Sequence, residues 1–432
     1  MTLPTLIVFA VALLASTGFA WVIHPSYDES SVPEFVLPDP LVSADGTPIT
    51  TEEQWPARRA ELLECFRDQM FGRLGEVTRA ADVRFERIES DSAALDGKAT
   101  RRQVRIHFTH QGDGLSMDLL LYLPNDAAGP VPVFVGMNFD GNHTVHDDPA
   151  ILLPRSWVRD SDTLGVANHQ ASEAGRGARK SRWPIETILA RGYGIATVYY
   201  GELDPDFDDG LGNGVHGLAP PEDESDRPGD AGGAIAAWAW GYSRALDYMA
   251  TDDAVDAARV IAMGHSRLGK AALWAGANDE RFAMVVSNNS GCGGAALSRR
   301  RFGETIYAIN SRFPHWFCSN FHAYNDNETE LPFDQHELLA LIAPRPVYVA
   351  SAQDDRWADP RGEFLACVHA SPVYELLGVD GLKTDTMPAV NAPQHEGRVG
   401  YHLRTGGHDV TAYDWQQYLD FADRHVKGQV DE

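Results

Sequence analysis

One short stretch in the middle of the chain constrains its fold more than any other. An apolar segment, Val260–Met263, runs into the letters GHSR at 264–267, and a helix-forming sequence, KAALWAGA, follows at 270–277. A serine on a sharp turn from strand to helix has its hydroxyl exposed above the sheet. The helix N-terminus then supplies backbone N–H groups where an oxyanion would form. Gly264 permits the tight turn, and the stretch predicts Ser266 as a nucleophile in an α/β protein.

Strand-like and helix-like segments alternate along the chain from Val104. This alternation predicts an α/β fold, a three-layer α/β/α sandwich with a mostly parallel central sheet. Sites in such sheets lie at the carboxyl ends of the strands. The expected strands are 104–108 and 116–123 as a hairpin at the sheet edge, then 132–137, 194–199, 260–263, 283–286, 347–350 and 400–403, and the expected helices include 184–190, 234–249 and 268–276.

Composition excludes several classes of protein. The 432 residues are 44% hydrophobic, which is ample for a buried core. The chain carries 36 Lys and Arg against 62 Asp and Glu, a formal net charge of −26. Nucleic-acid binding needs clustered basic residues, and docking on an anionic membrane needs them too. We therefore expect neither nucleic acid nor a membrane surface as a partner, and we expect a monomer.

The N-terminus resembles an export signal. An apolar run, Leu6–Ala15, is followed by small residues at Gly18 and Ala20, which predicts a signal peptide over residues 1–20 and a secreted or periplasmic protein. No Lys or Arg precedes the run, so an uncleaved anchor and a plain buried helix are the alternatives. Residues 21–432 are expected to form a single catalytic domain whose first 40 residues are irregular and lie on its surface. An exported chain could form one or two disulfides among Cys65, Cys292, Cys318 and Cys367.

A serine nucleophile needs a base, and the base needs an acidic residue to orient it. In α/β-hydrolases these follow along the chain in the order serine, acid, histidine. His408 lies in a Gly-rich loop after the last expected strand and fits the base. Asp354 and Asp355 both follow the strand at 347–350, and either could be the acid or a turn residue. His265 adjoins the serine, but we expect its side chain to point away from it.

With these residues, the chain resembles the glucuronoyl esterases of bacterial type, carbohydrate esterase family 15 of the α/β-hydrolase superfamily. The family's nucleophile motif is G-x-S-R-x-G-K, and GHSRLGK at 264–270 matches it throughout. The motif accounts for a glycine at 269 where α/β-hydrolases usually carry it at the position of Leu268. Further matching stretches are DPDFDDG at 204–210, NGVH at 213–216, SGCGGAAL at 290–297, GET at 303–305, PHWF at 314–317, LPFDQHELLALIAPRP at 331–346 and DDRWADP at 354–360.

The resemblance implies a role for each matching residue. It makes Ser266 the nucleophile and His408 the general base. The remaining roles are oxyanion stabilisation by Arg267, contact with glucuronate hydroxyls by Lys270, a hydrogen bond to the sugar ring by Glu304 and the pocket wall by Trp357.

The acid is where the chain departs from the fungal pattern. Fungal members carry a glutamate directly before S-G-x-G-G, where this chain has Asn289. Asparagine can orient an imidazole but cannot balance its developing charge. Many bacterial relatives carry an aspartate two residues before the tryptophan, which implies Asp355, with Asp354 and Asn289 as the less certain candidates.

The implied activity is hydrolysis of esters of 4-O-methyl-glucuronic acid, the links between glucuronoxylan and lignin, through an acyl-enzyme and without cofactor or metal. An acetyl xylan or feruloyl-type esterase on the same fold is the first alternative. An inactive carbohydrate-binding relative is the second, because Asn289 replaces the fungal acid. The acidic segment Asp204–Gly210 partly resembles a calcium loop but lacks a glutamate at the twelfth position, so we expect a plain turn.

Overall fold

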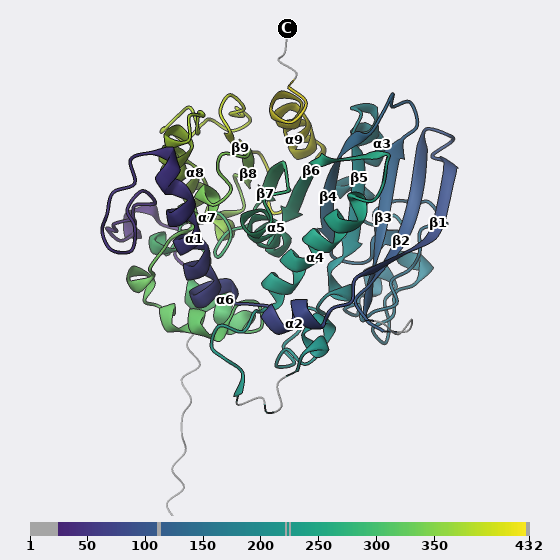
Figure 1. Ribbon diagram of the computed structural model, residues 1–432, viewed down its shortest axis with the longest axis horizontal. Helices are drawn as coiled ribbons and strands as arrows, with labels where there is room; N and C mark the ends of the chain where they lie inside the picture. Colours follow the sequence, from purple (N-terminus) through teal and green to yellow (C-terminus); the bar gives the residue numbers. More distant parts are fainter. Residues whose placement is uncertain (1–24, 110–113, 221–222, 224–225, 429–432) are drawn as a thin grey trace, which may run out of the picture.

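The structure is a computed structural model that describes residues 25–109, 114–220, 223 and 226–428. Within these residues one nine-stranded sheet has the order β1-β2-β3-β5-β4-β6-β7-β8-β9 (Figure 1). The strands β1, β2, β3 and β5 pair antiparallel, whereas β5, β4, β6, β7, β8 and β9 pair parallel. The bounds are β1 Arg84–Ala94, β2 Ala99–His107, β3 Ser116–Pro124, β4 Val131–Asn138, β5 Gly194–Tyr199, β6 Val255–His265, β7 Met284–Asn288, β8 Val347–Ala352 and β9 Val399–Arg404.

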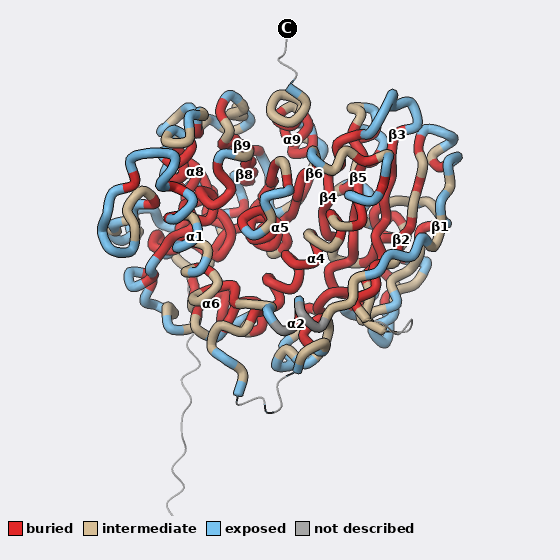
Figure 2. Tube along the Cα trace, in the orientation of Figure 1, coloured by how far each residue is buried: buried red, intermediate tan, exposed pale blue. Residues whose placement is uncertain are grey.

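Helices cover both faces of this sheet, because its central strands are apolar on both sides. In β4, Val133 and Val135 belong to one hydrophobic cluster and Phe134 to the other. The larger cluster includes residues of α1 Trp55–Phe66, α4 Ala234–Met249, α5 Arg267–Asn278, α6 Ile306–Arg312, α7 Gln335–Ala340 and α8 Pro360–Leu376. The smaller cluster includes residues of α3 Ile185–Ala190 and α9 Ala412–His425, and a short helix, α2 Gly75–Ala80, lies at the surface. Figure 2 shows the buried interior between these layers.

The predicted fold class is confirmed, and each strand predicted by residue range is present. Two predictions about the periphery are wrong. The edge strand is β1, which the sequence does not reveal because its side chains are mostly exposed and charged. The segment expected to be irregular up to about residue 60 contains the start of α1, which Trp55, Leu62 and Phe66 bury against the core.

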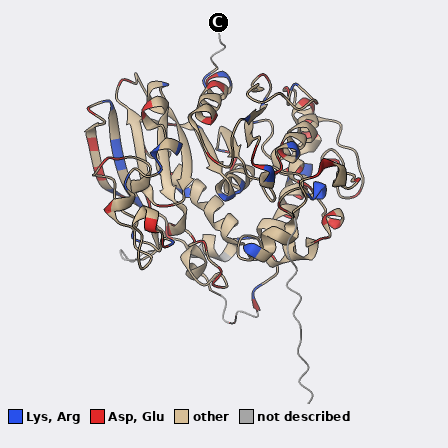
Figure 3. Ribbon diagram, turned by 180° about the vertical axis from the view of Figure 1, so that it is seen from behind, with Lys and Arg blue, Asp and Glu red and all other residues tan. Residues whose placement is uncertain are grey.

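The two edges of the sheet are finished differently. β1 has register shifts between Arg87 and Glu89 and again farther along, and at two positions an acidic residue of β1 faces an arginine of β2. Arg101 of β2 binds Glu89 at 3.0 Å, and the ribbon in Figure 3 carries both acidic (red) and basic (blue) positions on the strands at this edge. At the other edge, Gln394 bonds to Tyr401 of β9, with N···O distances of 2.8 and 3.1 Å.

Strand order assembles the predicted site residues. The strands β6, β7, β8 and β9 are consecutive and parallel, so their carboxyl ends meet at one edge. Ser266 follows β6 directly, Asn289 follows β7, and Asp355 and His408 lie in the loops after β8 and β9. Four segments spread over about 140 residues of sequence therefore come together at adjacent strand ends.

The signal peptide expected at residues 1–20 lies outside the described residues. In the part of the chain that is described, no helix is both long and apolar enough to cross a bilayer. All four cysteines are free thiols, so neither of the disulfides that an exported chain could form is present.

Candidate active site

Ser266 occupies a strained turn between β6 and α5. Its φ of +58° and ψ of −129° are rare for a residue with a side chain. The Ser266 N–H donates to the carbonyl of Asn288 at 2.8 Å, and its own carbonyl accepts from Gly269 N at 2.9 Å, in the first turn of α5. These backbone bonds hold the turn that connects the sheet to the helix.

Two glycines let the turn close. A Cβ atom at Gly264 would lie 1.9 Å from the carbonyl oxygen of Leu268, so no other residue fits there. A Cβ atom at Gly269 would lie 3.1 Å from the carbonyl oxygen of Gly264. Gly269 is therefore the residue of α5 that closely approaches the backbone of Gly264, whereas Leu268 is buried in the core.

The structure pairs His408 with Asp355. The Nδ1 atom of His408 lies 2.6 Å from Oδ2 of Asp355, which is buried. Asn289 Nδ2 donates to the same carboxylate oxygen at 2.8 Å. The side chain of Asp354 is exposed, and its backbone N–H donates to the carbonyl of Gly406 in the histidine loop at 3.0 Å. Of the two aspartates that the sequence leaves open, Asp355 contacts the histidine, and Asn289 supports that carboxylate.

One cavity of about 310 Å³ brings the predicted site residues together. Every one of them lines it except Asp354, which points to solvent. Six further residues complete the wall: Ser290, Gly291, Arg312, Phe313, Trp316 and Ala358. The cavity therefore contains the Ser266 hydroxyl, an imidazole, two carboxyl groups, three cations and aromatic surface.

Arg267 is held at the cavity by a buried carboxylate and by aromatic rings. Its Nη1 forms a close ion pair with Oδ2 of Asp206. The guanidinium carbon lies 4.7 Å from the centre of the Trp316 ring and 5.4 Å from that of Phe313, within cation–π range. Because both rings are themselves stacked, with centroids 3.8 Å apart, the guanidinium has little freedom to move.

Asp206 is a functional-site residue that sequence analysis missed. It accepts hydrogen bonds from His315 Nε2 at 3.0 Å, Trp316 Nε1 at 2.8 Å and the Tyr200 hydroxyl at 3.1 Å. Burial alone would raise the pKa of Asp206, but the bond from His315 and the charge of Arg267 outweigh it and hold the pKa well below its usual value. The signal was present, since Asp206 lies in the matching stretch DPDFDDG and Trp316 in PHWF.

The same segment does not form the calcium loop considered above. Asp204 and Asp206 are buried, whereas Asp208 and Asp209 are exposed, so their carboxylates do not converge. The described residues contain no group of three side chains placed to hold a metal ion.

Lys270 and Glu304 influence each other across the cavity. Lys270 is buried on α5, and its Nζ donates to the carbonyl of Ser290 at 2.5 Å. Burial lowers the pKa of Lys270, and the charge of Glu304 opposes that shift. Burial raises the pKa of Glu304, which the cations Lys270 and Arg312 oppose. The pair gives the cavity one strong donor and one carboxyl group whose pKa is raised.

Trp357 adds a further aromatic ring to the cavity wall. Its carbonyl accepts from the backbone N–H of Glu304 at 3.0 Å, which ties the acid loop to the loop before α6. The guanidinium of Arg312 lies 5.3 Å from the centre of the Trp357 ring. The exposed Arg312 thus covers the outer end of this wall.

His265 precedes Ser266, and its ring lies against the ring of His408, with centroids 4.5 Å apart. His265 is buried and its Nδ1 lies 2.6 Å from Oδ1 of Asn288. This contact joins the end of β6 to the loop after β9, and sequence spacing does not convey it.

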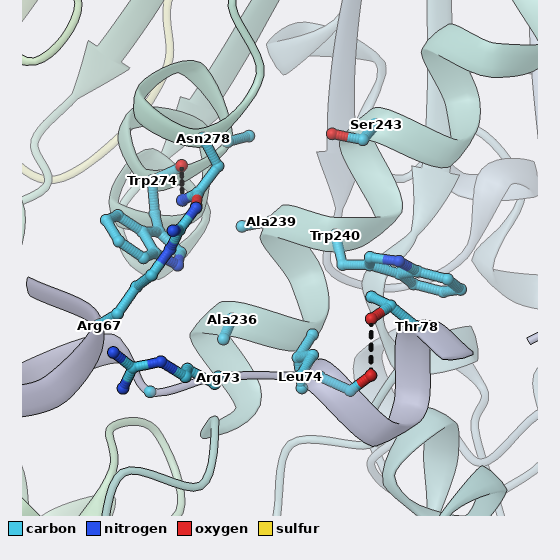
Figure 4. Close-up of a pocket in the computed structure, with 13 residues that line it drawn as sticks. Arg67, Arg73, Leu74, Thr78, Ala236, Ala239, Trp240, Ser243, Trp274 and Asn278 are labelled. Atoms are coloured by element: carbon cyan, nitrogen blue, oxygen red, sulfur yellow. Dashed lines mark hydrogen bonds between the residues drawn. The ribbon is translucent and has the colours of Figure 1, made fainter. Parts of the chain in front are cut away.

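A second hollow of about 310 Å³ lies between α4, α5 and the segment that includes α2 (Figure 4). None of the predicted site residues lines it. Its two arginines are engaged with neighbours, since Arg67 bonds to Asn278 and Arg73 to Asp230. This hollow is separate from the cavity of Ser266.

Comparison with known proteins agrees with the geometry. A family model described as "Glucuronyl esterase, fungi" matches residues 228–378. "Carbohydrate esterase MZ0003", from an unknown prokaryotic organism, is 51% identical over 93% of this chain and 92% of its own length. The solved structure of a promiscuous CE15 esterase from a marine bacterial metagenome is 50% identical, with a TM-score of 0.87, over 93% of this chain and 100% of that one. A glucuronoyl esterase from Solibacter usitatus is 48% identical, with a TM-score of 0.86, over 92% of this chain and 99% of that one.

The sheet order, the strand-to-helix turn and these relatives define an α/β-hydrolase that acts as a carboxylic ester hydrolase. Within that class, the chain belongs to carbohydrate esterase family 15, the glucuronoyl esterases. The membership predicted from the sequence motifs is confirmed.

Proposed function

We propose that the protein hydrolyses esters on the carboxyl group of 4-O-methyl-glucuronic acid, as found between glucuronoxylan and lignin alcohols. The observation that carries the proposal is the single cavity that holds Ser266 and the His408–Asp355 pair beside Arg267 and Lys270. A hydroxyl with an oriented base suits ester cleavage, and fixed cations suit a carbonyl oxygen and sugar hydroxyls.

In the first half of the reaction, the Ser266 oxygen attacks the uronate carbonyl carbon while His408 accepts its proton. Asp355, on the other ring nitrogen, holds the imidazole and stabilises the imidazolium. Arg267 and the backbone N–H groups at the start of α5 stabilise the oxyanion. His408 then gives its proton to the leaving alcohol, which departs and leaves the uronate esterified to Ser266.

In the second half, water enters the position of the alcohol. His408 takes a proton from the water as its oxygen attacks the acyl carbon, and a second oxyanion forms at Arg267. The C–O bond to Ser266 breaks, the serine oxygen regains the proton from His408, and the free uronic acid leaves.

The sugar is recognised by polar groups deeper in the cavity. Lys270 donates to hydroxyl oxygens, Glu304 accepts from a hydroxyl, and Trp357 packs on the ring face. Sites that hydrogen-bond substrate hydroxyls reject analogues that lack them far more strongly than apolar pockets do. Because the esterified uronate is neutral, the net charge of −26 does not repel it.

The test is hydrolysis of benzyl glucuronate by the wild type and by the Ser266→Ala variant. We expect the variant to lose about 10⁵-fold or more in kcat, as loss of a serine nucleophile does elsewhere. Equal activity of the two proteins would reject Ser266 as the nucleophile.

A broader ester range is the second candidate, because the 50% identical structure is that of a promiscuous CE15 esterase. Lys270, Glu304 and Trp357 have no evident use for an acetyl group, so we place acetyl or feruloyl esters behind glucuronates. Comparing kcat/KM for benzyl glucuronate with that for a p-nitrophenyl acetate ester would rank them.

Three further expectations belong to this proposal. The alternative of an inactive carbohydrate-binding relative rested on Asn289, which cannot supply a negative charge to the histidine. It loses that support because Asp355 contacts His408. Cleavage of residues 1–20 on export would be tested by N-terminal sequencing of the mature protein. The expected monomer would be tested by light scattering, and neither nucleic acid nor a membrane surface is expected as a partner.

A further inference from the structure

His408 is held by a loop that does not by itself fix the plane of its ring. Its side chain is 42% exposed, and the neighbouring Gly406 has a φ of +90° in a segment without helix or strand. Asp355 holds the ring at one edge through Nδ1. A single hydrogen bond at one edge leaves the ring free to tilt about that bond, so the direction of the opposite nitrogen needs a second support.

His265 supplies a surface at the face of that ring. The two imidazoles are 4.5 Å apart between centroids, with their planes at 42°. On another side, Phe139 meets His265 edge to face at 6.0 Å and 83°. Since His265 is buried and bonded to Asn288, it is the fixed member of the imidazole pair and His408 is the exposed one.

The proton of His265 can be assigned from its neighbours. Asn288 Nδ2 lies 3.2 Å from Oδ1 of Asp414 and 2.7 Å from the Tyr418 hydroxyl. A carboxylate only accepts, so the amide nitrogen faces it and the amide oxygen must accept from His265. His265 therefore carries its proton on Nδ1.

His265 is neutral in this arrangement. Burial lowers its pKa well below the usual value, and the charges of His408, Arg182 and Arg404 act in the same direction. The carboxylate nearest to it along the hydrogen-bonded path, Asp414, is separated from it by the Asn288 amide. A neutral ring beside His408 does not oppose the imidazolium that forms during the reaction.

Asp414 also holds the loop of His408. The Arg404 guanidinium Nε lies 2.9 and 2.8 Å from the two Asp414 oxygens. Its Nη2 donates to the carbonyls of Gly407 at 3.1 Å and Asp409 at 2.6 Å, on either side of His408. The buried carboxylate of Asp414, at the start of α9, thus orients the loop that carries His408. Through Asn288 it also orients the ring of His265, on which His408 packs.

We infer that His265 is a positioning residue for the base: its ring face fixes the plane of His408, and Asp414 fixes both rings through Asn288 and Arg404. This inference rests on the proposed role of His408. His265 occupies the first variable position of the G-x-S-R-x-G-K motif, between Gly264 and Ser266, and positioning the base is its purpose there.

Two substitutions separate the ring of His265 from its hydrogen bond. In His265→Asn the amide nitrogen takes the place of Nδ1 and can still donate to Asn288, but the ring face is lost. In His265→Phe the ring face remains and the donor is lost. A misplaced catalytic group can cost on the order of 10²-fold in rate, so we expect His265→Asn to lower kcat for benzyl glucuronate by about 10- to 100-fold with KM little changed. We expect His265→Phe to lose about threefold or less, even if its melting temperature falls.

The second readout is the proton NMR signal of the His408 Nδ1–H that binds Asp355. We expect it to persist in His265→Phe and to broaden by exchange with water in His265→Asn. The inference is overturned if His265→Asn keeps kcat within about threefold, or if both variants lose kcat in proportion to their loss of folded protein. His408→Ala, measured in parallel, distinguishes the two levels: wild-type activity there would reject the proposed function, whereas its inactivity beside a fully active His265→Asn would reject the positioning role alone.

Discussion

The two sides of the cavity are built on different principles. On one side, Ser266 and His408 lie on turns after strand ends, and the histidine is 42% exposed. On the other side, Arg267 and Lys270 lie in the first turn of α5, where buried acceptors engage both of them. In the proposed reaction, protons and water pass on the first side, and the second side presents charge that does not rearrange.

The difference shows where the chain places carboxylates beside its cations. The negative charge of Asp206 attracts Arg267, and that of Glu304 attracts Lys270. Both cations are therefore held in place. Preorganised charges of this kind stabilise a transition state because no reorganisation is needed when charge develops. We therefore expect substitutions on the serine side to change kcat and substitutions on the Lys270 side to change KM, with Arg267 contributing to kcat.

The largest effect after loss of the serine is expected for Asp355→Asn. The variant keeps the shape of the carboxylate but cannot stabilise the imidazolium, so kcat for benzyl glucuronate should fall about 10⁴-fold. Asp354→Asn is the matched control, since that side chain is exposed and should be neutral within about twofold. Equal losses in the two variants would contradict the assignment of Asp355.

A smaller effect is expected for Arg267→Lys. An ammonium cannot reproduce the planar fork that reaches Asp206 and an oxyanion together, so kcat should fall about 10²-fold. Asp206→Asn keeps the guanidinium but weakens its anchor, and its loss should be the smaller of the two. Wild-type kcat in Asp206→Asn would show that the aromatic rings alone position Arg267.

For Lys270→Met we expect KM for benzyl glucuronate to rise about tenfold with a smaller change in kcat, because a charged hydrogen bond to the sugar is lost. The pKa of Glu304, which burial already raises, should rise further without its cation. Hydrolysis of p-nitrophenyl acetate is the control reaction, since acetate has no hydroxyls to bind. An equal loss of activity on p-nitrophenyl acetate would mean that Lys270 contributes to the chemical step and not to binding of the sugar.

The smallest expected effect is on stability and concerns Glu363 of α8. It accepts from Gly291 N at 3.0 Å and from Ser351 Oγ at 2.6 Å, next to the segment that carries Asn289. Burial raises the pKa of Glu363 from 4.5 to about 8. Below pH 4.5 both the folded and unfolded states hold the proton, but between pH 4.5 and 8 only the folded state does, so rising pH costs the wild type stability in that window.

Glu363→Gln resembles the protonated acid at every pH. The free energy of unfolding of this variant should therefore gain on that of the wild type by roughly 3 kcal/mol between pH 5 and pH 8. Urea unfolding of both proteins at the two pH values measures the gain. A difference that does not change with pH would mean that Glu363 is ionised in the folded protein throughout.

Local patterns in the sequence predict the centre of the molecule well. The turn at Ser266 is encoded by neighbours within a few residues, and the buried strands are apolar runs. The sequence pattern does not predict β1, because this solvated edge strand has charged side chains and no alternation of apolar and polar residues.

The supports of the site depend on contacts that sequence spacing does not encode. Asp206 is 61 residues from Arg267, and one aspartate among several in an acidic turn gives no sign that it is buried. Asp354 and Asp355 are adjacent, so the choice between them depends on which side chain faces inward. The orientation of His265 depends on the same kind of packing, with a loop that follows the last strand.

The edges of the sheet have a consequence for the protein in concentrated solution. An open strand edge is a template on which another chain can add a strand and start an aggregate. Here β1 is irregular in register and lined with charge, and the outer side of β9 is already occupied by Gln394. A nine-stranded sheet can thus be kept at high concentration without adjacent molecules joining edge to edge.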